Sequence, residues 1–181
     1  DGGIPVHTPE NKMQDNIIRR KGMITVDDEG SMTGDVQMIY AGYFWDNESK
    51  HVIDEPKSKT DDHMNRVLNL NSYTADGYNV RSTMAGKIPV INESMSVKGE
   101  GSVRNAGRRR FLDAGIFESY IVTPTSTEPR KNRFRLATSY ETMDTIVYKF
   151  TGNYVLENFK SGSIDLPFAS YHYNAAIDGG N

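Results

Sequence analysis

The chain has 181 residues, enough for one domain with a substantial core, although only 36% of them are hydrophobic. Its 21 basic and 24 acidic side chains give a formal net charge of −3, which argues against a nucleic acid or an anionic membrane as partner. The absence of cysteine excludes a disulfide framework, a thiolate metal site and a cysteine nucleophile, and no apolar run approaches the ~20 residues of a membrane-spanning helix.

Residues 1–16 are polar and contain two prolines, so we predict an extended lead-in or linker there. The chain begins without Met and without a signal peptide, and we therefore expect a fragment of a longer or processed protein. Residues 17–181 are predicted to form one domain.

Two alternating runs, residues 17–26 and 34–41, carry the clearest local signal. Each run keeps its large apolar residues on one side: Ile18, Ile24, Val26, Val36, Met38 and Tyr40. The acidic segment between them contains Gly30, which adopts a positive φ at little steric cost. The pattern predicts a β-hairpin.

In the middle of the chain, apolar and polar residues alternate less regularly. Residues 46–59 are charged and contain Pro56, which indicates a surface excursion. Thr60 is suited to cap a short helix over residues 61–70, and three apolar residues at helical spacing would face the sheet: Met64, Val67 and Leu68. Further strands are expected over residues 78–84, 87–92, 93–99 and 116–122.

The last third of the chain, residues 144–177, contains four short apolar runs separated by turn residues. We expect these runs to form an antiparallel meander around which the chain is organised: 146–150, 154–156, 164–168 and 171–177. The predicted fold is all-β or β-dominated, an antiparallel β-sandwich-like domain with one short crossover helix. The last strand should be an edge that contacts a neighbouring copy of the chain or remains mobile.

The titratable residues do not form a convincing catalytic or metal-binding pattern. The four histidines are scattered. His63 follows Asp61 and Asp62 and could contact a metal, but a solvated helix start explains these residues better. The acidic segment at residues 27–29 lacks the spacing of a calcium loop. We therefore expect no metal, no cofactor and no enzymatic activity.

Two groups of residues are candidates for ligand binding or for an interface. The aromatic run comprises Tyr43, Phe44 and Trp45, which suit stacking on a sugar or packing against another domain. The alternative is that some of these rings simply face the core. The basic run comprises Arg108, Arg109 and Arg110, which suit a phosphate or an acidic glycan. Its alternative is a solvated loop paired with nearby acids.

Several motifs resemble a known family. Residues 27–43 combine Asp-Asp-Glu-Gly-Ser-x-x-Gly, an alternating strand and Tyr-x-Gly-Tyr, and further matches follow in order at 92–97, 144–160 and 168–171. Together they resemble the C-terminal β-rich domain, itself of unknown function, of bacterial secreted transglutaminase-like proteins. Two prolines of that domain's pattern are missing, and Asn153 stands where it has Gly.

The resemblance implies an accessory role. The family's chemistry belongs to a Cys-His-Asp triad in a separate core domain, and this chain has no Cys to carry it. The expected function is a non-catalytic interaction domain of a periplasmic or extracellular protein, with a neighbouring domain of a longer chain as partner. The alternative is a carbohydrate-binding module with an exposed aromatic surface.

Overall fold

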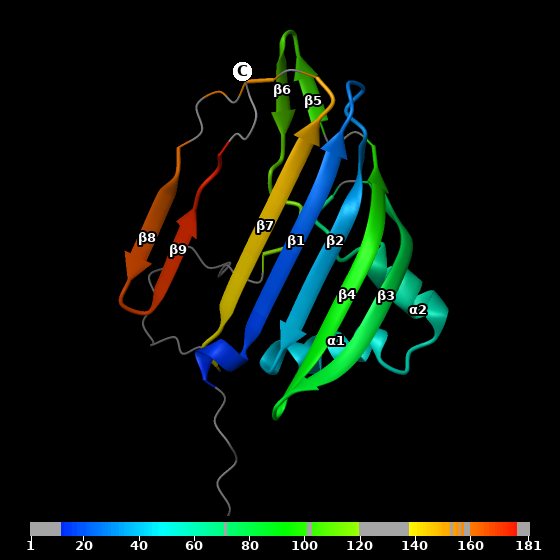
Figure 1. Cartoon of the computed structure of the whole chain (residues 1–181), viewed down its shortest axis with the longest axis vertical. Helices are drawn as coiled ribbons and strands as arrows, with labels where there is room; N and C mark the ends of the chain where they lie inside the picture. Colours follow the sequence, from blue (N-terminus) through cyan, green and yellow to red (C-terminus); the bar gives the residue numbers. More distant parts are fainter. Residues whose placement is uncertain are drawn as a thin grey trace, which may run out of the picture.

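The computed structural model describes residues 12–70, 72–100, 103–119, 138–152, 154–155, 157 and 160–176. Strand outweighs helix, 54% to 15%, so the predicted β-dominated class is confirmed. A 3-10 helix at Met13–Asp15 is followed by β1 (Ile17–Val26), β2 (Met32–Ala41), α1 (Tyr43–Val52), α2 (Lys57–Met64), β3 (Tyr73–Ala85), β4 (Ile88–Gly99), β5 (Val103–Ala106), β6 (Arg109–Leu112), β7 (Glu141–Phe150), β8 (Gly162–Leu166) and β9 (Ala169–Tyr173) (Figure 1).

Five strands form the main sheet, in the order β3-β4-β2-β1-β7. The predicted hairpin is confirmed: β1 and β2 pair antiparallel, and Gly30 turns between them with φ +89°. One predicted break is wrong, because residues 87–92 and 93–99 belong to the single strand β4 despite Pro89. Pro89 pairs with Met84 close to the end of the sheet, where a missing N–H costs little.

The core lies between the main sheet and the two helices. β1, β2 and β4 bury alternate side chains on the face that α1 and α2 cover, while their other face is exposed (Figure 1). The most deeply buried apolar residues include Ile18, Ile24, Val26, Val36, Met38, Tyr40, Met64 and Ile91. The parity predicted for β1 and β2 therefore identifies the buried face correctly.

The architecture differs from the predicted antiparallel sandwich. β7 pairs with β1 in parallel, so the main sheet is mixed. A parallel neighbour requires a crossover connection, and β1 ends at residue 26 whereas β7 begins at residue 141. Among the described residues, the two helices cover the inner face together with Val103, Ile116 and Phe117, and no second large sheet lies against it. The domain is thus built of a helical layer on a sheet.

Two helices replace the single one that was predicted. α1 occupies the aromatic run and part of the predicted surface excursion, and α2 begins at Lys57 rather than at residue 61. The inward face of α1 includes Phe44 and a charged residue, Glu48, and this charge interrupts the apolar stripe by which a helix is recognised. Pro56 immediately precedes α2, where its missing N–H and fixed φ are compatible with a helix start.

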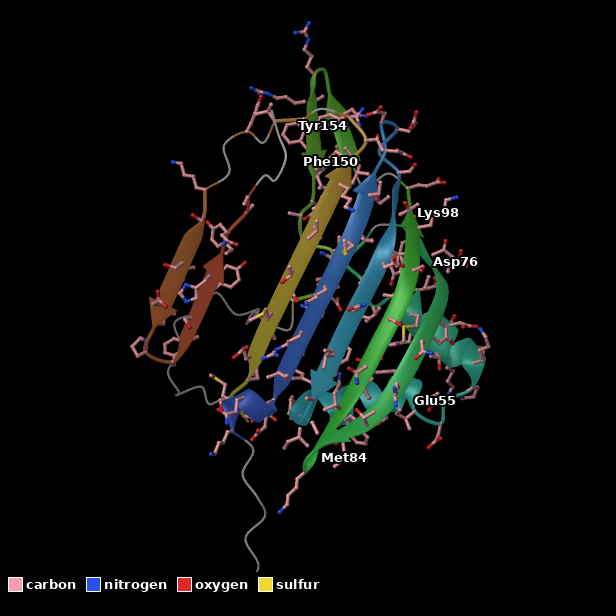
Figure 2. The ribbon with its side chains drawn as sticks, viewed as in Figure 1. Glu55, Asp76, Met84, Lys98, Phe150 and Tyr154 are labelled. Atoms are coloured by element: carbon pink, nitrogen blue, oxygen red, sulfur yellow. The ribbon has the colours of Figure 1, made fainter. Side chains whose placement is uncertain are left out.

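The predicted C-terminal meander is wrong as an organising element. Its first run belongs to β7 in the main sheet, and its third and fourth runs form the separate hairpin β8–β9. Tyr154 and Val155 of the second run lie outside any strand. Figure 2 shows Phe150 and Tyr154 at the β5–β6 end of the molecule, opposite Met84, and their rings are 5.4 Å apart.

Several expected features lie partly or wholly outside the described residues. These are most of the lead-in, the end of the run at 116–122, and residues 177–181. Ile116 and Phe117 are buried in an irregular segment, where Phe117 forms a single bridge with Leu68. Within the described part of the chain, neither helix has the length and apolar character needed to cross a bilayer.

Candidate functional site

The position of α1 follows from a sharp turn at the end of β2. Gly42 has φ +60° and ψ −123°, and the amide of Tyr43 donates to Asn16 Oδ1 at 2.9 Å. Asn16, itself fully buried, thus satisfies one of the free N–H groups at the start of the helix. This arrangement turns Phe44 and Glu48 toward the sheet.

α2 is fixed by polar contacts with β3 and by its own apolar residues. Tyr78 Oη donates to Asp61 Oδ1 at 2.8 Å, and Tyr73 Oη donates to the Met64 carbonyl at 2.8 Å. Met64 is fully buried, and Val67 packs against the same core. His63 consequently points from α2 toward α1.

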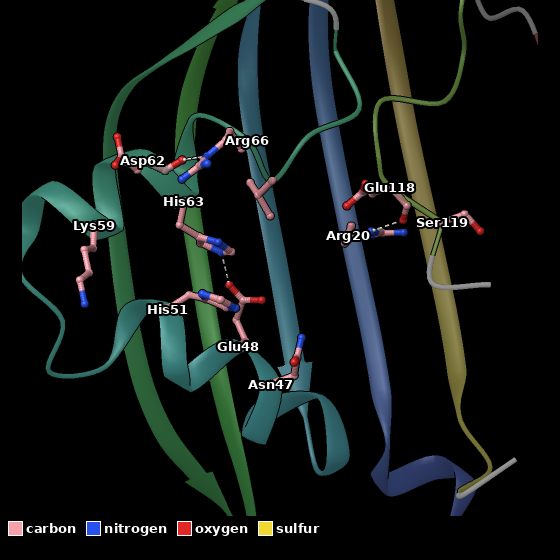
Figure 3. Close-up of a pocket in the computed structure, with 11 residues that line it drawn as sticks. Arg20, Asn47, Glu48, His51, Lys59, Asp62, His63, Arg66, Glu118 and Ser119 are labelled. Carbon is pink, nitrogen blue, oxygen red and sulfur yellow. Dashed lines mark hydrogen bonds and ion pairs between the residues drawn. The ribbon is translucent and has the colours of Figure 1, made fainter. Parts of the chain in front are cut away.

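A cavity of about 600 Å³ lies between the two helices and the segment at residues 116–119. Figure 3 shows His63 and His51 with Glu48 on one side of it, and Arg20 with Glu118 and Ser119 on the other. Polar and charged side chains dominate its lining: Arg20, Asn47, Glu48, His51, Lys59, Asp62, His63, Arg66, Glu118 and Ser119, together with Val67.

A carboxylate–imidazole pair forms one wall of the cavity. His63 Nε2 lies 2.5 Å from Glu48 Oε1, and the Glu48 side chain is only 3% exposed. The His51 ring stacks on the His63 ring, with centroids 4.7 Å apart and planes 5° from parallel. The bond to Glu48 and the stacking together hold the His63 imidazole in one orientation.

A second carboxyl group lies behind the first. Glu93 projects from β4 on the buried face and is 3% exposed. Neither of its carboxyl oxygens has a hydrogen-bond donor among the described residues. Burial, and after it the neighbouring Glu48 carboxylate, raise the pKa of Glu93 to about 9. A Glu93 carboxyl that keeps its proton at neutral pH has an O–H to donate, and the Glu48 carboxylate beside it is an acceptor.

The opposite wall is built around Arg20 of β1. Its Nε donates to Asp144 Oδ1 at 2.7 Å and one Nη to Asp144 Oδ2 at 2.8 Å, while the other Nη donates to the Glu118 carbonyl at 2.9 Å. The guanidinium also lies 4.8 Å from the centre of the Phe117 ring. Arg20 thereby connects β1, β7 and the segment at residues 116–119.

The cavity is chemically suited to proton exchange and polar recognition. Among the described residues, no three His, Asp or Glu side chains are arranged to hold a metal ion. Glu48 lines the cavity but is almost fully buried, and Glu93 lies outside the lining, so a bound molecule would meet mainly His63, His51 and the other groups of the lining.

The aromatic run predicted as a ligand or interface site does not form one surface. Phe44 is buried and packs edge-on against Tyr140, with ring centroids 5.4 Å apart. Tyr43 is exposed, and Trp45 is half-buried with its indole N–H donating to Ser82 Oγ at 3.3 Å. Phe44 thus fits the core interpretation, and an interface role for Tyr43 and Trp45 stays a prediction.

The basic run lies in the β5–β6 hairpin, away from the cavity (Figure 1). Arg109 forms an ion pair with Glu157 at 3.0 Å. Arg110 donates to the Asp28 carbonyl at 2.6 Å and lies 4.9 Å from the centre of the Tyr154 ring. Arg108 is exposed. Two of the three arginines therefore have partners nearby, and anion binding by this run remains untested.

Sequence reasoning missed most of the cavity, and it assigned His63 to a solvated helix start. A usable signal exists in two of the strands: Arg20 and Glu93 occupy the apolar parity of β1 and β4. A charged residue on the buried side of an alternating strand must find a partner. The identity of that partner depends on tertiary structure.

Comparison with known proteins found no match: no family model, no curated protein and no solved structure corresponds to the chain.

Proposed function

We propose that the chain is a non-catalytic accessory domain of an extracytoplasmic transglutaminase-like protein. We further propose that it binds a neighbouring domain of that protein through one face of the β8–β9 hairpin. The resemblance of its motifs supports the family, and the absence of a thiol supports a role outside the catalytic core. The main observation in support of docking is the exposed apolar face of this hairpin.

The hairpin is amphipathic by its register. Ile164 pairs with Tyr171, and Gly162 pairs with Tyr173, so these residues share one face with Leu166. We call the set Ile164, Leu166, Tyr171 and Tyr173 the hairpin face. These four side chains are 57%, 50%, 57% and 44% exposed.

The other side of the hairpin is polar. Ser163 pairs with His172 and Asp165 with Ser170, and His172 Nε2 lies 3.4 Å from Asp165 Oδ1. A polar side opposite an apolar side is typical of a hairpin that has one face in solvent and the other packed on a partner.

A two-stranded hairpin is marginally stable by itself in water. β8 and β9 pair only with each other within the described part of the chain, and Figure 1 shows them beside the main sheet. A neighbouring domain that covers the hairpin face would stabilise the hairpin by removing its apolar surface from water. This need for a cover favours a protein partner.

One observation favours a carbohydrate as a second candidate. The Tyr171 and Tyr173 rings lie 5.7 Å apart on the exposed hairpin face, inclined by 33°. Neighbouring exposed rings are a platform on which sugars stack. A sugar would contact the two rings without needing Ile164 and Leu166.

The test is hydrogen exchange of the β8–β9 amides, measured in the chain alone and in the longer natural protein. We expect slow exchange only in the longer protein, and loss of that protection in Tyr171→Asp. Ser170→Asp is the matched control, because it adds the same charge to the polar side of the same strand. Equal exchange rates in the two proteins would refute docking. Titration with neutral oligosaccharides that shifts only the tyrosine resonances would favour the second candidate.

A further inference from the structure

The wall of the cavity connects three elements through three titratable side chains. Glu93 belongs to β4, Glu48 to α1 and His63 to α2. The chain of contacts runs from the buried Glu93 carboxyl to Glu48 and then, at 2.5 Å, to His63. A carboxyl group thus links α1 to the sheet, and a carboxylate–imidazole pair links α1 to α2.

The two carboxyl groups can coexist in this place with only one negative charge between them. Two ionised carboxylates are acceptors only, and both Glu93 oxygens would remain buried without a donor. One shared proton satisfies both groups, because Glu93 then donates to Glu48, and Glu48 also accepts from His63. This geometry favours a proton bound between the two carboxyl groups.

We propose that Glu93, Glu48 and His63 form a proton-dependent latch that holds α1 and α2 on the sheet and keeps the cavity formed. When Glu93 loses its proton, a second negative charge appears beside Glu48 in the buried layer. Repulsion and the cost of burying that charge then favour separation of the helices from β4. This inference is independent of the proposed docking through the hairpin face.

No described neighbour on the sheet neutralises that second charge. Glu93 pairs with Met38 of β2 and Val80 of β3, which are apolar. The charged groups that face the same cavity from β1, α1, α2 and the flanking segments are Arg20, His51, Lys59, Asp62, Arg66 and Glu118. Arg20 is engaged by Asp144 and Lys59 by Glu55, so their charges are compensated elsewhere.

The direction of the pH effect follows from proton linkage. The folded protein holds the Glu93 proton up to about pH 9, whereas an unfolded chain releases it near 4.5. The contribution of Glu93 to stability is therefore fully present below about pH 4.5 and is lost as the pH rises to about 9. One proton changes the folding constant by about tenfold per pH unit over that interval.

The first test is a carbon-13 titration of the glutamate carboxyl groups in the intact chain. One carboxyl resonance should titrate near pH 9, and it should be missing in Glu93→Gln. Gln keeps the shape and donates an N–H to Glu48 in place of the carboxyl proton, so we expect this variant to fold. Titration of the Glu93 carboxyl near its ordinary pKa would overturn the proposal without any variant.

The second test compares folding constants between pH 5 and pH 10. The ratio of the wild-type constant to that of Glu93→Gln should fall by up to about tenfold per pH unit and level off above about pH 9. Glu100→Gln is the control, because it removes an exposed carboxylate at the end of the same strand. Its ratio to wild type should stay flat.

The third test locates the opening. Amide protection factors, corrected for the intrinsic rate at each pH, should fall in α1 and α2 between pH 7 and pH 10, and the helices should stay less protected than β1 and β2 throughout that range. Glu93→Gln should abolish that fall. The same protection in helices and strands, or no loss in the helices, would refute a latch that acts on the helices.

Discussion

The β1–β2 hairpin and the β8–β9 hairpin show one sequence pattern with two outcomes. In both, apolar side chains alternate with polar ones and lie opposite each other across an antiparallel pair. Ile24 in β1 is 1% exposed because helices and the 116–119 segment contribute to the core against it, whereas Ile164 in β8 is 57% exposed. Alternation thus predicts a strand and its apolar side, but whether another element covers that side depends on the rest of the fold.

The largest expected effect is the cost of truncating the same residue type in the two hairpins. Ile24→Ala should lower the free energy of unfolding by about 2–5 kcal/mol, because it leaves a cavity in a packed core. Ile164→Ala should change it by no more than about 0.5 kcal/mol in the isolated chain. Denaturant unfolding of both variants measures the difference, and similar losses would mean that the hairpin face is packed in solution.

Arginine ion pairs extend the same comparison to charge. Arg20 is buried and makes three hydrogen bonds, so Arg20→Met should destabilise the chain by about 2–3 kcal/mol. Arg109 forms an exposed pair with Glu157, and Arg109→Met should cost less than about 1 kcal/mol. The control is salt: 0.5 M NaCl should weaken only the exposed pair. A strongly salt-dependent cost for Arg20→Met would contradict its buried placement.

Two glycines have nearly the same φ but differ in the space that surrounds them. Gly42 and Gly86 have φ of +60° and +63°. A Cβ at Gly42 would collide with the carbonyl of Asp15 and with Asn16 Oδ1, whereas one at Gly86 would meet nothing within 4 Å. Gly86→Ala should cost about 1–2 kcal/mol from backbone strain. Gly42→Ala should cost about 1–3 kcal/mol more through overpacking, and its ψ of −123°, outside the left-handed region, adds to its strain. Thermal unfolding measures both, and equal costs would refute the tight start of α1.

How far the fold could be predicted depended on whether charges interrupted its apolar patterns. β1 and β2 were predicted almost to the residue, because an acidic turn with Gly30 separates two alternating runs, and the one charge on the buried side of β1, Arg20, does not break the alternation. α1 was missed because Glu48 lies on its buried face, where a helix normally has an apolar residue. The candidate site was missed for the same reason, because charged residues occupy positions where the pattern predicts apolar ones.

The partners of these charges could not be found from local sequence. Glu93 is separated from Glu48 by the whole of α2 and β3, and Arg20 meets Asp144 only because β7 returns parallel to β1. Sequence patterns report short-range periodicity, and these pairs form through long-range topology. For the same reason, alternation in the last third of the chain suggested an organising meander although most of its side chains are exposed.

The smallest expected effect concerns Trp45, the only tryptophan of the chain and a reporter for the rim of the helical layer. Ser82→Ala removes the acceptor of the indole N–H and should cost less than about 1 kcal/mol, because a half-buried N–H finds water instead. The emission of Trp45 should shift and its quenching by acrylamide should increase. Ser96→Ala is the control. It removes a 2.7 Å hydrogen bond from Ser96 Oγ to Asp35 on the exposed face of β4 and β2, at a similar cost, and it should leave the emission unchanged. Deep-blue emission that resists quenching in the wild-type chain would place Trp45 fully in the core. Trp45 would then be as well covered as the buried residues of the β1–β2 hairpin, unlike the exposed residues of the β8–β9 hairpin.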